Sequence, residues 1–408
     1  MKLIFNDDTF SFELLRTLSY APFGGADIGE CLATAYRIRE GDMESWYTEW
    51  YKTAERVFAY GEESLERGKL VNAKENYLRA SNYYRTAEFF LHGNQQDPRI
   101  LDTWGKSRHA FHKAIKLLNI SVEKVEIPYE DTTIPGYFYS VDQKIRPTLL
   151  VHGGFDSTGE ELYFEVGVSA LERGYNCLTF EGPGQGSVIR EQKIPFRYDW
   201  EKVVTPVVDY LVTRSEVDTK KIALLGISLG GYLAPRAAAF EHRLAACIAN
   251  DGLFSNQFRE MGRKFYQGRD EEFNKPAFME EFVQFLMKQS TNVQWAIENG
   301  MFTYGASSVI DLIEKTDAIT LEGVADKIKC PTLVCEAEAD HFFAGQPKML
   351  YDALTCPKTF LSFTAEDGAE EHCQFGALVY FNQRMFEWLD GILNIESGLN
   401  NQNTISTL

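Results

Sequence analysis

The chain has 408 residues, of which 44% are hydrophobic and 25% charged, which is typical of a globular protein with a large core. Its formal net charge of −18 at pH 7 argues against nucleic acid and against an anionic membrane surface as partners. The seven cysteines are scattered without a C-x-x-C pair, the start lacks a secretory apolar region, and no apolar run could span a bilayer. We therefore expect reduced thiols and a cytoplasmic protein.

Helical periodicity marks the first part of the chain. Apolar and small residues recur at steps of four and three from Ala73 to Leu91, which indicates one face of an amphipathic helix. The spacing from Trp46 to Phe58 indicates another helix. A tetratricopeptide-like array would need a second copy of the pattern, which we do not find. We therefore predict a helical cap over residues 1–120.

From residue 121 the pattern changes to short strands. Residues 125–129 alternate in polarity and residues 136–139 begin a partner run, which predicts two antiparallel strands. Six apolar runs follow, separated by helical stretches, and this alternation predicts an α/β protein with a mostly parallel sheet of eight strands. The six runs are residues 148–151, 176–180, 222–225, 246–249, 332–335 and 359–363.

The stretch between the sixth and seventh predicted strands is too long for a simple crossover. Residues 253–327 contain eleven aromatic side chains, and an insertion there would cover the carboxyl edge of the sheet, where ligands bind. We expect most of these aromatics to form the insertion's own core and a minority to face substrate. The catalytic core then comprises residues 121–252 and 328–396, and a loose tail follows at 397–408.

A serine flanked by glycines follows the predicted strand at 222–225. Residues 226–231 read GISLGG and precede a helical pattern, so a buried strand runs into a serine at the head of a helix. Such a turn strains the backbone and exposes the hydroxyl, and the glycines avoid collisions in it. Ser228 is therefore the predicted nucleophile.

A serine nucleophile needs a base, and the base needs an orienting acid. Asp340 follows the seventh predicted strand and His372 follows the eighth, in the chain order of serine, acid and histidine. Asp251, after the sixth strand, is an alternative acid because its loop lies near the serine turn. His341 adjoins Asp340 and cannot easily turn back to it, so we expect it to lie at the surface or line the pocket.

Two backbone donors must stabilise the oxyanion of the reaction. One is the N–H of Leu229, and the other comes from residues 152–156 (HGGFD), where either Gly154 or Phe155 could donate. Asp156 could keep a proton and bind a substrate carbonyl, or it could cap a following helix, which we favour. His152 and Asp156 are the candidate substrate-binding residues.

Motifs for metals and cofactors are absent from the sequence. It contains no H-E-x-x-H and no Cys/His ligand spacing. Residues 182–186 (GPGQG) lack both the Lys-Ser/Thr of a P-loop and the G-x-G-x-x-G spacing, so they indicate a turn beside the pocket. We expect no metal and no cofactor.

Four motifs together resemble α/β-hydrolases of the 2,6-dihydroxypseudooxynicotine hydrolase group, which is related to FrsA-like esterases. They are residues 152–158 (HGGFDST), 180–186 (FEGPGQG), 226–231 (GISLGG) and 244–248 (LAACI). The resemblance covers about residues 120–390 and implies an α/β-hydrolase fold with an N-terminal helical cap. It also implies a triad of Ser228, Asp340 and His372. The named member cleaves a carbon–carbon bond beside an aryl ketone and carries Glu in place of Asp156; esterases share the pattern.

We therefore predict a serine hydrolase that acts through an acyl-enzyme on a small apolar, aromatic or ketide-like carbonyl substrate. An ester and a ketone carbon–carbon bond both fit. An acylaminoacyl-type peptidase is one alternative, although such enzymes usually carry a β-propeller. A non-catalytic binding protein on this scaffold is another, and the complete triad argues against it. The expected partner is the small molecule, and a homodimer through the cap is compatible with the resemblance.

Overall fold

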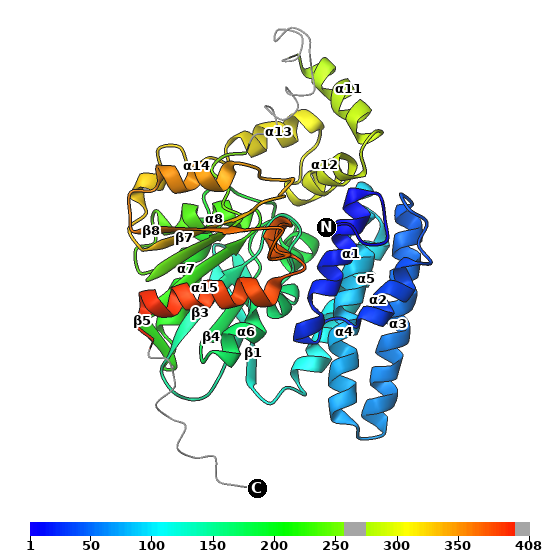
Figure 1. Cartoon of the computed structure of the whole chain (residues 1–408), viewed down its shortest axis with the longest axis horizontal. Helices are drawn as coiled ribbons and strands as arrows, with labels where there is room; N and C mark the ends of the chain where they lie inside the picture. Colours follow the sequence, from blue (N-terminus) through cyan, green and yellow to red (C-terminus); the bar gives the residue numbers. More distant parts are fainter. Residues whose placement is uncertain (257–274, 396–408) are drawn as a thin grey trace.

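The computed structural model describes residues 1–256 and 275–395, and places an eight-stranded sheet beside a group of N-terminal helices (Figure 1). The strands are β1 (Ser121–Tyr129), β2 (Thr132–Ser140), β3 (Arg146–His152), β4 (Asn176–Phe180), β5 (Val217–Ile227), β6 (Ala246–Asn250), β7 (Thr332–Ala337) and β8 (Lys358–Phe363). The helices are α1 (Asp8–Ser19), α2 (Ile28–Ala35), α3 (Met43–Glu66), α4 (Leu70–Glu88), α5 (Pro98–Ile115), α6 (Val168–Glu172), α7 (Glu201–Val212), α8 (Gly230–Ala238), α11 (Pro276–Met287), α12 (Thr291–Thr303), α13 (Val309–Asp317), α14 (Gln346–Ala353) and α15 (Leu378–Leu393).

The sheet has the strand order β1-β2-β4-β3-β5-β6-β7-β8. The pairs β1–β2 and β2–β4 are antiparallel, and the other pairs are parallel. The prediction of a mostly parallel eight-stranded sheet with an N-terminal helical region is confirmed. Because β5 lies between β3 and β6, with β7 next, the loops after these four strands meet at one edge of the sheet.

The central strands of the sheet are buried on both faces, which explains their apolar residues. Every residue of β4 and β6 is buried. Along β5, Leu224 packs in a cluster with residues of α7 and α8, whereas Ala223 and Leu225 pack on the opposite side with residues of α15. This alternation follows from the two-residue period of a strand, so a parallel sheet covered by helices requires apolar residues at consecutive positions.

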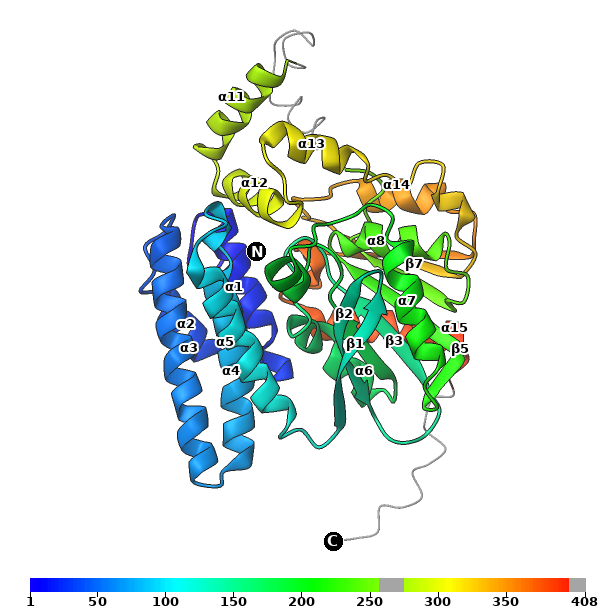
Figure 2. The same ribbon diagram turned by 180° about the vertical axis from the view of Figure 1, so that it is seen from behind.

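The N-terminal helices have an aromatic core of their own, and α3, α4 and α5 lie side by side next to the sheet (Figure 2). Helix α1 joins this core to the catalytic core. Phe10 and Leu14 pack with the helices, whereas Phe12 and Leu15 pack in the cluster that contains β5 and α15. Since both sides of α1 are buried, the helical region and the sheet share a continuous packed interior.

The insertion between β6 and β7 contributes α11, α12 and α13. Its buried aromatic rings pack against other parts of the chain. Trp295 stacks on Phe89, and the ring centroids of Tyr304 and Phe196 are 5.1 Å apart. Phe302 stacks on His92. We expected most aromatics to form the insertion's own core; among the described ones, Phe278 and Phe282 do stack on each other, whereas the three buried rings pack against other parts of the chain.

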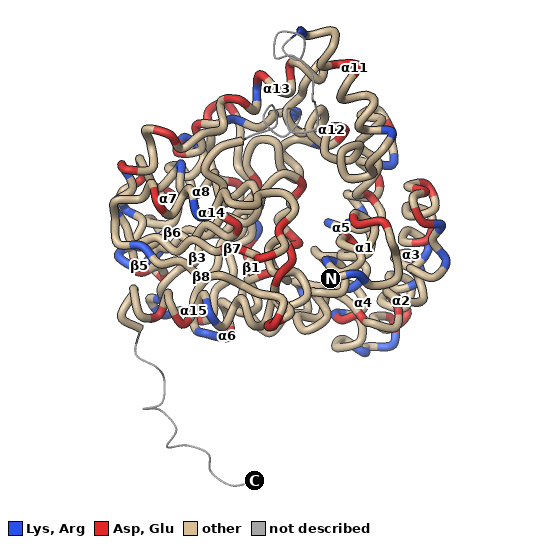
Figure 3. Tube along the Cα trace, turned by 45° about the horizontal axis from the view of Figure 1, so that its top comes forward, with Lys and Arg blue, Asp and Glu red and all other residues tan. Residues whose placement is uncertain are grey.

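The aromatic residues at 258, 265, 266 and 273 and the predicted tail at 397–408 lie outside the described residues. Among the residues that the structure does describe, every helix is too short or too polar to cross a bilayer. In the view of Figure 3, Lys and Arg are interspersed with Asp and Glu along the chain trace.

Candidate active site

The turn between β5 and α8 holds Ser228 in a strained conformation. Its φ is 63°, in the left-handed region that residues with side chains rarely adopt. A Cβ on Gly226 would collide with the carbonyl group of Gly230, and a Cβ on Gly231 would lie 2.6 Å from the carbonyl oxygen of Asp251. The turn therefore requires its glycines, and it leaves Ser228 partly accessible at the end of the central strand.

Three predicted residues meet at this edge of the sheet. The Nε2 atom of His372 lies 2.9 Å from Oγ of Ser228, and its Nδ1 atom lies 2.9 Å from Oδ2 of Asp340. The other oxygen of Asp340 accepts hydrogen bonds from the backbone N–H groups of Phe342 and Phe343 at 2.8 and 3.2 Å. Because a carboxylate faces Nδ1, that nitrogen carries the proton, and Nε2 is left to accept one from the serine.

The alternative acid, Asp251, lies at the same imidazole. Its Oδ2 is 3.0 Å from Nδ1 of His372, so two carboxylates face one ring nitrogen. Asp251 is fully buried, and its φ is 55°. The geometry brings both candidate acids to His372 and does not choose between them.

The two carboxylates make His372 more basic. Burial alone would lower the pKa of His372, but Asp340, with contributions from Cys373 and Asp251, raises it well above 6.5. Burial and the charge of Asp340 raise the pKa of Asp251. Although burial also penalises its charge, His372 and two backbone donors hold the pKa of Asp340 below its ordinary value. This arrangement favours the imidazolium ion.

The loop after β3 lies directly against the serine turn. A Cβ on Gly154 would lie 2.6 Å from the backbone nitrogen of Leu229, so glycine alone allows this approach. Among the described residues, neither the N–H of Leu229 nor that of Phe155 has a hydrogen-bond acceptor. The carbonyl oxygen of Phe155 accepts a hydrogen bond from the side chain of Asn299 in α12 at 3.1 Å. Two unused donors therefore lie on either side of the close contact.

Asp156 plays neither of the roles that the sequence suggested. Its Oδ2 accepts hydrogen bonds from Arg16 of α1 at 2.6 Å and from Arg85 of α4 at 3.0 Å. Burial alone would raise the pKa of Asp156, but the two guanidinium groups lower it, so the carboxylate is charged. The expected helix cap is replaced by an ion pair, and the expected neutral acid is excluded by the same two arginines.

The arginines belong to a larger buried network that the sequence did not predict. Arg16 also binds Glu161 through two parallel hydrogen bonds of 2.8 Å, and Tyr20 donates to Glu161 at 2.6 Å. Arg16 and Arg85 are 6% and 7% exposed, which is rare for arginine outside ion pairs. The sequence offers one signal for Arg16 and Arg85: each is a charged residue among the apolar residues of a helix.

Two other histidines, His152 and His341, lie near the site. His152 is fully buried between Phe180 and Trp200, and burial lowers its pKa to about 4. It therefore reaches no solvent in this structure, and we do not include it among the substrate contacts. His341 is exposed and packs against Phe342, as a surface or pocket-lining residue would.

Aromatic rings from separate parts of the chain surround His372 and the loop after β3. Phe342 and Phe343 lie 4.8 and 5.3 Å from the ring of His372, and Phe12 of α1 lies 6.2 Å away, between centroids. Trp295 of α12 lies 5.8 Å from Phe155. The helical region, the insertion and the core therefore all contribute apolar surface beside the serine.

Among the described residues, one group has the geometry to hold a metal ion: Asp251, His372 and Cys373. The first two already form hydrogen bonds with each other and with neighbouring groups. Burial raises the pKa of the Cys373 thiol well above its ordinary value, so the sulfur stays protonated and is a poor ligand. The group therefore suits proton transfer better than metal binding.

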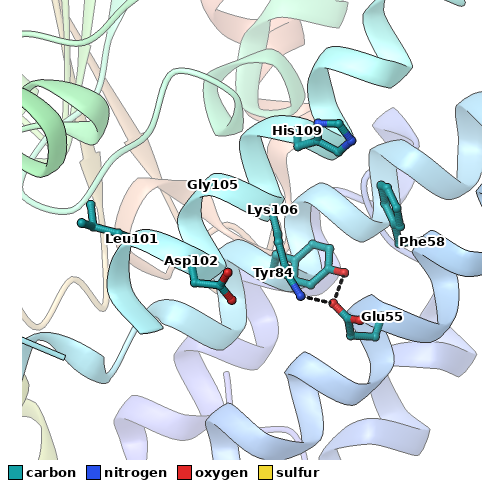
Figure 4. Close-up of a pocket in the computed structure, with 8 residues that line it drawn as sticks. All are labelled: Glu55, Phe58, Tyr84, Leu101, Asp102, Gly105, Lys106 and His109. Atoms are coloured by element: carbon teal, nitrogen blue, oxygen red, sulfur yellow. Dashed lines mark hydrogen bonds and ion pairs between the residues drawn. The ribbon is translucent and has the colours of Figure 1, made fainter. Parts of the chain in front are cut away.

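A separate cavity of about 460 Å³ lies among α3, α4 and α5 (Figure 4). Within it, Glu55 accepts hydrogen bonds from Lys106 at 2.7 Å and from Tyr84 at 2.6 Å. None of the residues described around Ser228 lines it. Glu55, Tyr84 and Lys106 bond one another, and this gives no indication of a ligand.

The fold and the serine turn define an α/β-hydrolase, and the chain belongs to the alpha/beta hydrolase family, whose pattern matches residues 148–370. It is 38% identical to hydrolase LUC6 of Fusarium sp., over 97% of this chain and 99% of that one. It is 37% identical to the 20-hydroxy-prefusarin hydrolase FUS2 of Gibberella moniliformis, again over 97% of this chain and 99% of the relative. The prediction of a hydrolase enzyme of this family is confirmed.

Solved structures show the same architecture. The 2,6-dihydroxy-pseudo-oxynicotine hydrolase matches with a TM-score of 0.72 and 22% identity, over 92% of this chain and 95% of that chain. AbyA5 matches with a TM-score of 0.63 and 16% identity, over 95% and 98%. These likenesses confirm the resemblance in fold, including the N-terminal helices, because nearly the whole of each chain is covered.

Proposed function

We propose that this hydrolase works through a triad of Ser228, His372 and Asp340 and forms an acyl-enzyme. The continuous hydrogen-bonded line from Oγ of Ser228 through the imidazole to Asp340 supports this most directly. As Oγ attacks a carbonyl carbon, Nε2 takes the serine proton and then gives it to the leaving group. A water molecule repeats the sequence on the acyl-enzyme, with His372 again as base, and releases the acid and the free serine.

Two backbone donors would hold the oxyanion that forms at each attack. The N–H of Leu229 lies at the head of α8, where the helix dipole favours negative charge. We place the second donor in the loop after β3, where the N–H groups of Gly154 and Phe155 both lack an acceptor among the described residues and Gly154 lies against the backbone nitrogen of Leu229. Removal of one such donor typically reduces kcat about 10²- to 10³-fold.

The substrate of this proposal is a small, apolar carbonyl compound with aromatic or ketide-like character. The rings of Phe155, Trp295 and Phe342 support an apolar substrate, because Phe342 lies beside His372, Phe155 follows Gly154 in the loop against the serine turn, and Trp295 packs against both rings. A relative that matches almost the whole chain is named as a hydrolase of 20-hydroxy-prefusarin, which supports a small molecule rather than a polymer.

Between the two candidate bonds, the charge of Asp156 favours the ester. Cleavage of a carbon–carbon bond leaves a carbanion that must be protonated or delocalised. Asp156 is the residue that could have served as the additional acid, but Arg16 and Arg85 keep it ionised. His372 is then the acid for the leaving group, which suits the alkoxide that an ester releases.

Turnover of two substrate series tests the proposal. We expect aryl esters of short and medium acyl chains to be hydrolysed faster than aryl 1,3-diketones, and Ser228→Ala to abolish both activities while circular dichroism stays unchanged. Faster cleavage of the diketones would reverse the choice of bond. Activity that survives in folded Ser228→Ala protein would reject the mechanism.

A further inference from the structure

The second carboxylate at His372 has no role in a three-residue triad. Asp251 directly follows β6 and is fully buried, with its φ at 55°. A buried carboxylate is costly unless its oxygens are hydrogen-bonded. Strained backbone at a residue with a side chain persists only where the surroundings hold it in place. Both the buried charge and the strained backbone therefore require stabilising interactions from neighbouring groups.

The partners of Asp251 are three consecutive residues of the histidine turn. Its Oδ2 accepts the backbone N–H of Cys373 and lies 3.0 Å from Nδ1 of His372. Its Oδ1 accepts a hydrogen bond from the side chain of Gln374 at 3.1 Å. Cys373 and Gln374 both have a φ of 55°, so this turn is strained as well. One carboxylate therefore fixes the turn that carries the imidazole and faces its Nδ1 proton.

Building on the triad proposed above, we propose that Asp251 is a second positioning residue for His372 and shares the Nδ1 proton with Asp340. Asp340 approaches from the loop after β7 and Asp251 from the loop after β6, so each can hold the ring without the other. Two negative charges at Nδ1 also stabilise the imidazolium that forms when Ser228 loses its proton. The arrangement gives this enzyme two acids where the triad needs one.

Other charged or titratable groups also face this pair. His341, in the loop after β7, and Asp156, in the loop after β3, interact electrostatically with His372. Cys335 and Glu336 of β7 interact in the same way with Asp251. Cys373 lies near both His372 and Asp251, on the turn that carries the imidazole. None of these groups is altered by the variants below, so a changed pH profile reports on Asp251 itself.

Asp251→Asn separates the effect of the negative charge from that of the hydrogen bonds that hold the histidine turn. Asparagine can still accept the N–H of Cys373. The Oε1 atom of Gln374 is buried and has no partner among the described residues, so a flip of that amide would let it accept from the new amide group. The variant therefore keeps the hydrogen bonds of the turn and loses only the negative charge. Asp352→Asn, at an exposed carboxylate paired with Lys348, is the matched control.

We expect Asp251→Asn to lower kcat/KM about 10-fold or more and to move the acidic limb of its pH profile to lower pH, because His372 becomes less basic. Thermal stability should stay near that of the control. An unchanged pH profile with unchanged kcat/KM would overturn the proposal and leave Asp251 a structural residue.

Asp340→Asn tests the proposal without any change at Asp251. With Asp251 still facing Nδ1, we expect kcat to fall by at most about 100-fold, whereas a triad deprived of its only acid loses about 10⁴-fold. A loss of about 10⁴-fold would overturn the shared role. Labelling of the wild-type serine by a fluorophosphonate separates the triad hypothesis from the hypothesis that Asp251 shares the Nδ1 proton. If the wild type is labelled, a negative result concerns Asp251 alone; if it is not, the triad itself is rejected.

Discussion

The carboxylate of Asp156 accepts a 2.6 Å hydrogen bond from Arg16, which lies 140 residues earlier in the chain. Asp156 belongs to the loop beside the nucleophile, whereas Arg16 belongs to the first helix. Arg85 of α4 binds the same oxygen. The N-terminal helices therefore do more than cover the site, because their guanidinium groups hold the loop that carries Gly154 and Phe155.

Arg16→Met should weaken both the fold and the reaction. The substitution leaves Glu161 and Asp156 with one guanidinium fewer in a buried site, and breaking such a pair costs about 3–5 kcal/mol. We expect a lower unfolding midpoint and a loss of about 10-fold or more in kcat/KM as the loop after β3 loosens. The control is Arg67→Met, at an exposed ion pair with Glu63 that contributes about 0–1 kcal/mol. Equal behaviour of the two variants would contradict the role of the network.

Gly154→Ala should damage catalysis more than folding. The new methyl group would lie 2.6 Å from the nitrogen of Leu229 and 2.9 Å from the carbonyl oxygen of Ile227, so the two loops must separate. We expect kcat to fall about 10²- to 10³-fold, as for the loss of an oxyanion donor. Gly105→Ala is the control, because a Cβ there meets no atom of the described part of the chain within 4 Å, apart from its own helix backbone. A Gly154→Ala enzyme with full activity would show that the close approach is not needed.

Local patterns in the sequence were sufficient to predict the serine turn, since strand, glycines and helix adjoin one another there. The position of a loop after a strand was likewise sufficient to predict that Asp340 and His372 lie at the same edge of the sheet as Ser228. The predicted strand at 222–225 was too short, because β5 begins at Val217 and its first half carries exposed polar residues. Apolar runs mark only the buried part of a strand.

The ion network could not be predicted in this way. Asp156 stands where aspartate often caps a helix, and the local rule favoured that role. A pairing between Arg16 and Asp156 depends on how α1 packs against the core, and no short pattern encodes it. The same holds for Asp251, since the sequence offered two acids and only the turn at 372–374 shows that both reach the imidazole.

The pH dependence of kcat/KM should show a basic histidine. His372 must be neutral to accept the serine proton, so activity rises as the pH increases through its pKa. Burial lowers that pKa, but the neighbouring carboxylates raise it further, so we expect the midpoint of the acidic limb above pH 6.5. A midpoint at or below this value in the wild type would contradict the electrostatics described for the site.

Glu165→Gln should stabilise the protein at alkaline pH. Burial, with a contribution from Glu161, raises the pKa of Glu165 to about 8 from its ordinary 4.5. The unfolded chain therefore ionises first, and the fold loses stability as the pH rises from 4.5 towards 8. Glutamine stays neutral and can donate its amide N–H to the oxygen of Tyr20, so we expect the unfolding midpoint at pH 9 to rise by about 2–4 °C, with little change at pH 5. Glu387→Gln, at an exposed carboxylate, should change neither value.

The central claim is that Ser228 is a nucleophile activated by His372, and covalent labelling tests it most directly. The purified protein is treated with a fluorophosphonate, and the adduct is located by peptide mass spectrometry, with Ser228→Ala and His372→Ala in parallel. We predict one equivalent of label on Ser228 in the wild type, none at that position in Ser228→Ala, and labelling slowed by about 10³-fold or more in His372→Ala. A folded wild-type protein that stays unlabelled, or that reacts at another residue, would contradict the claim.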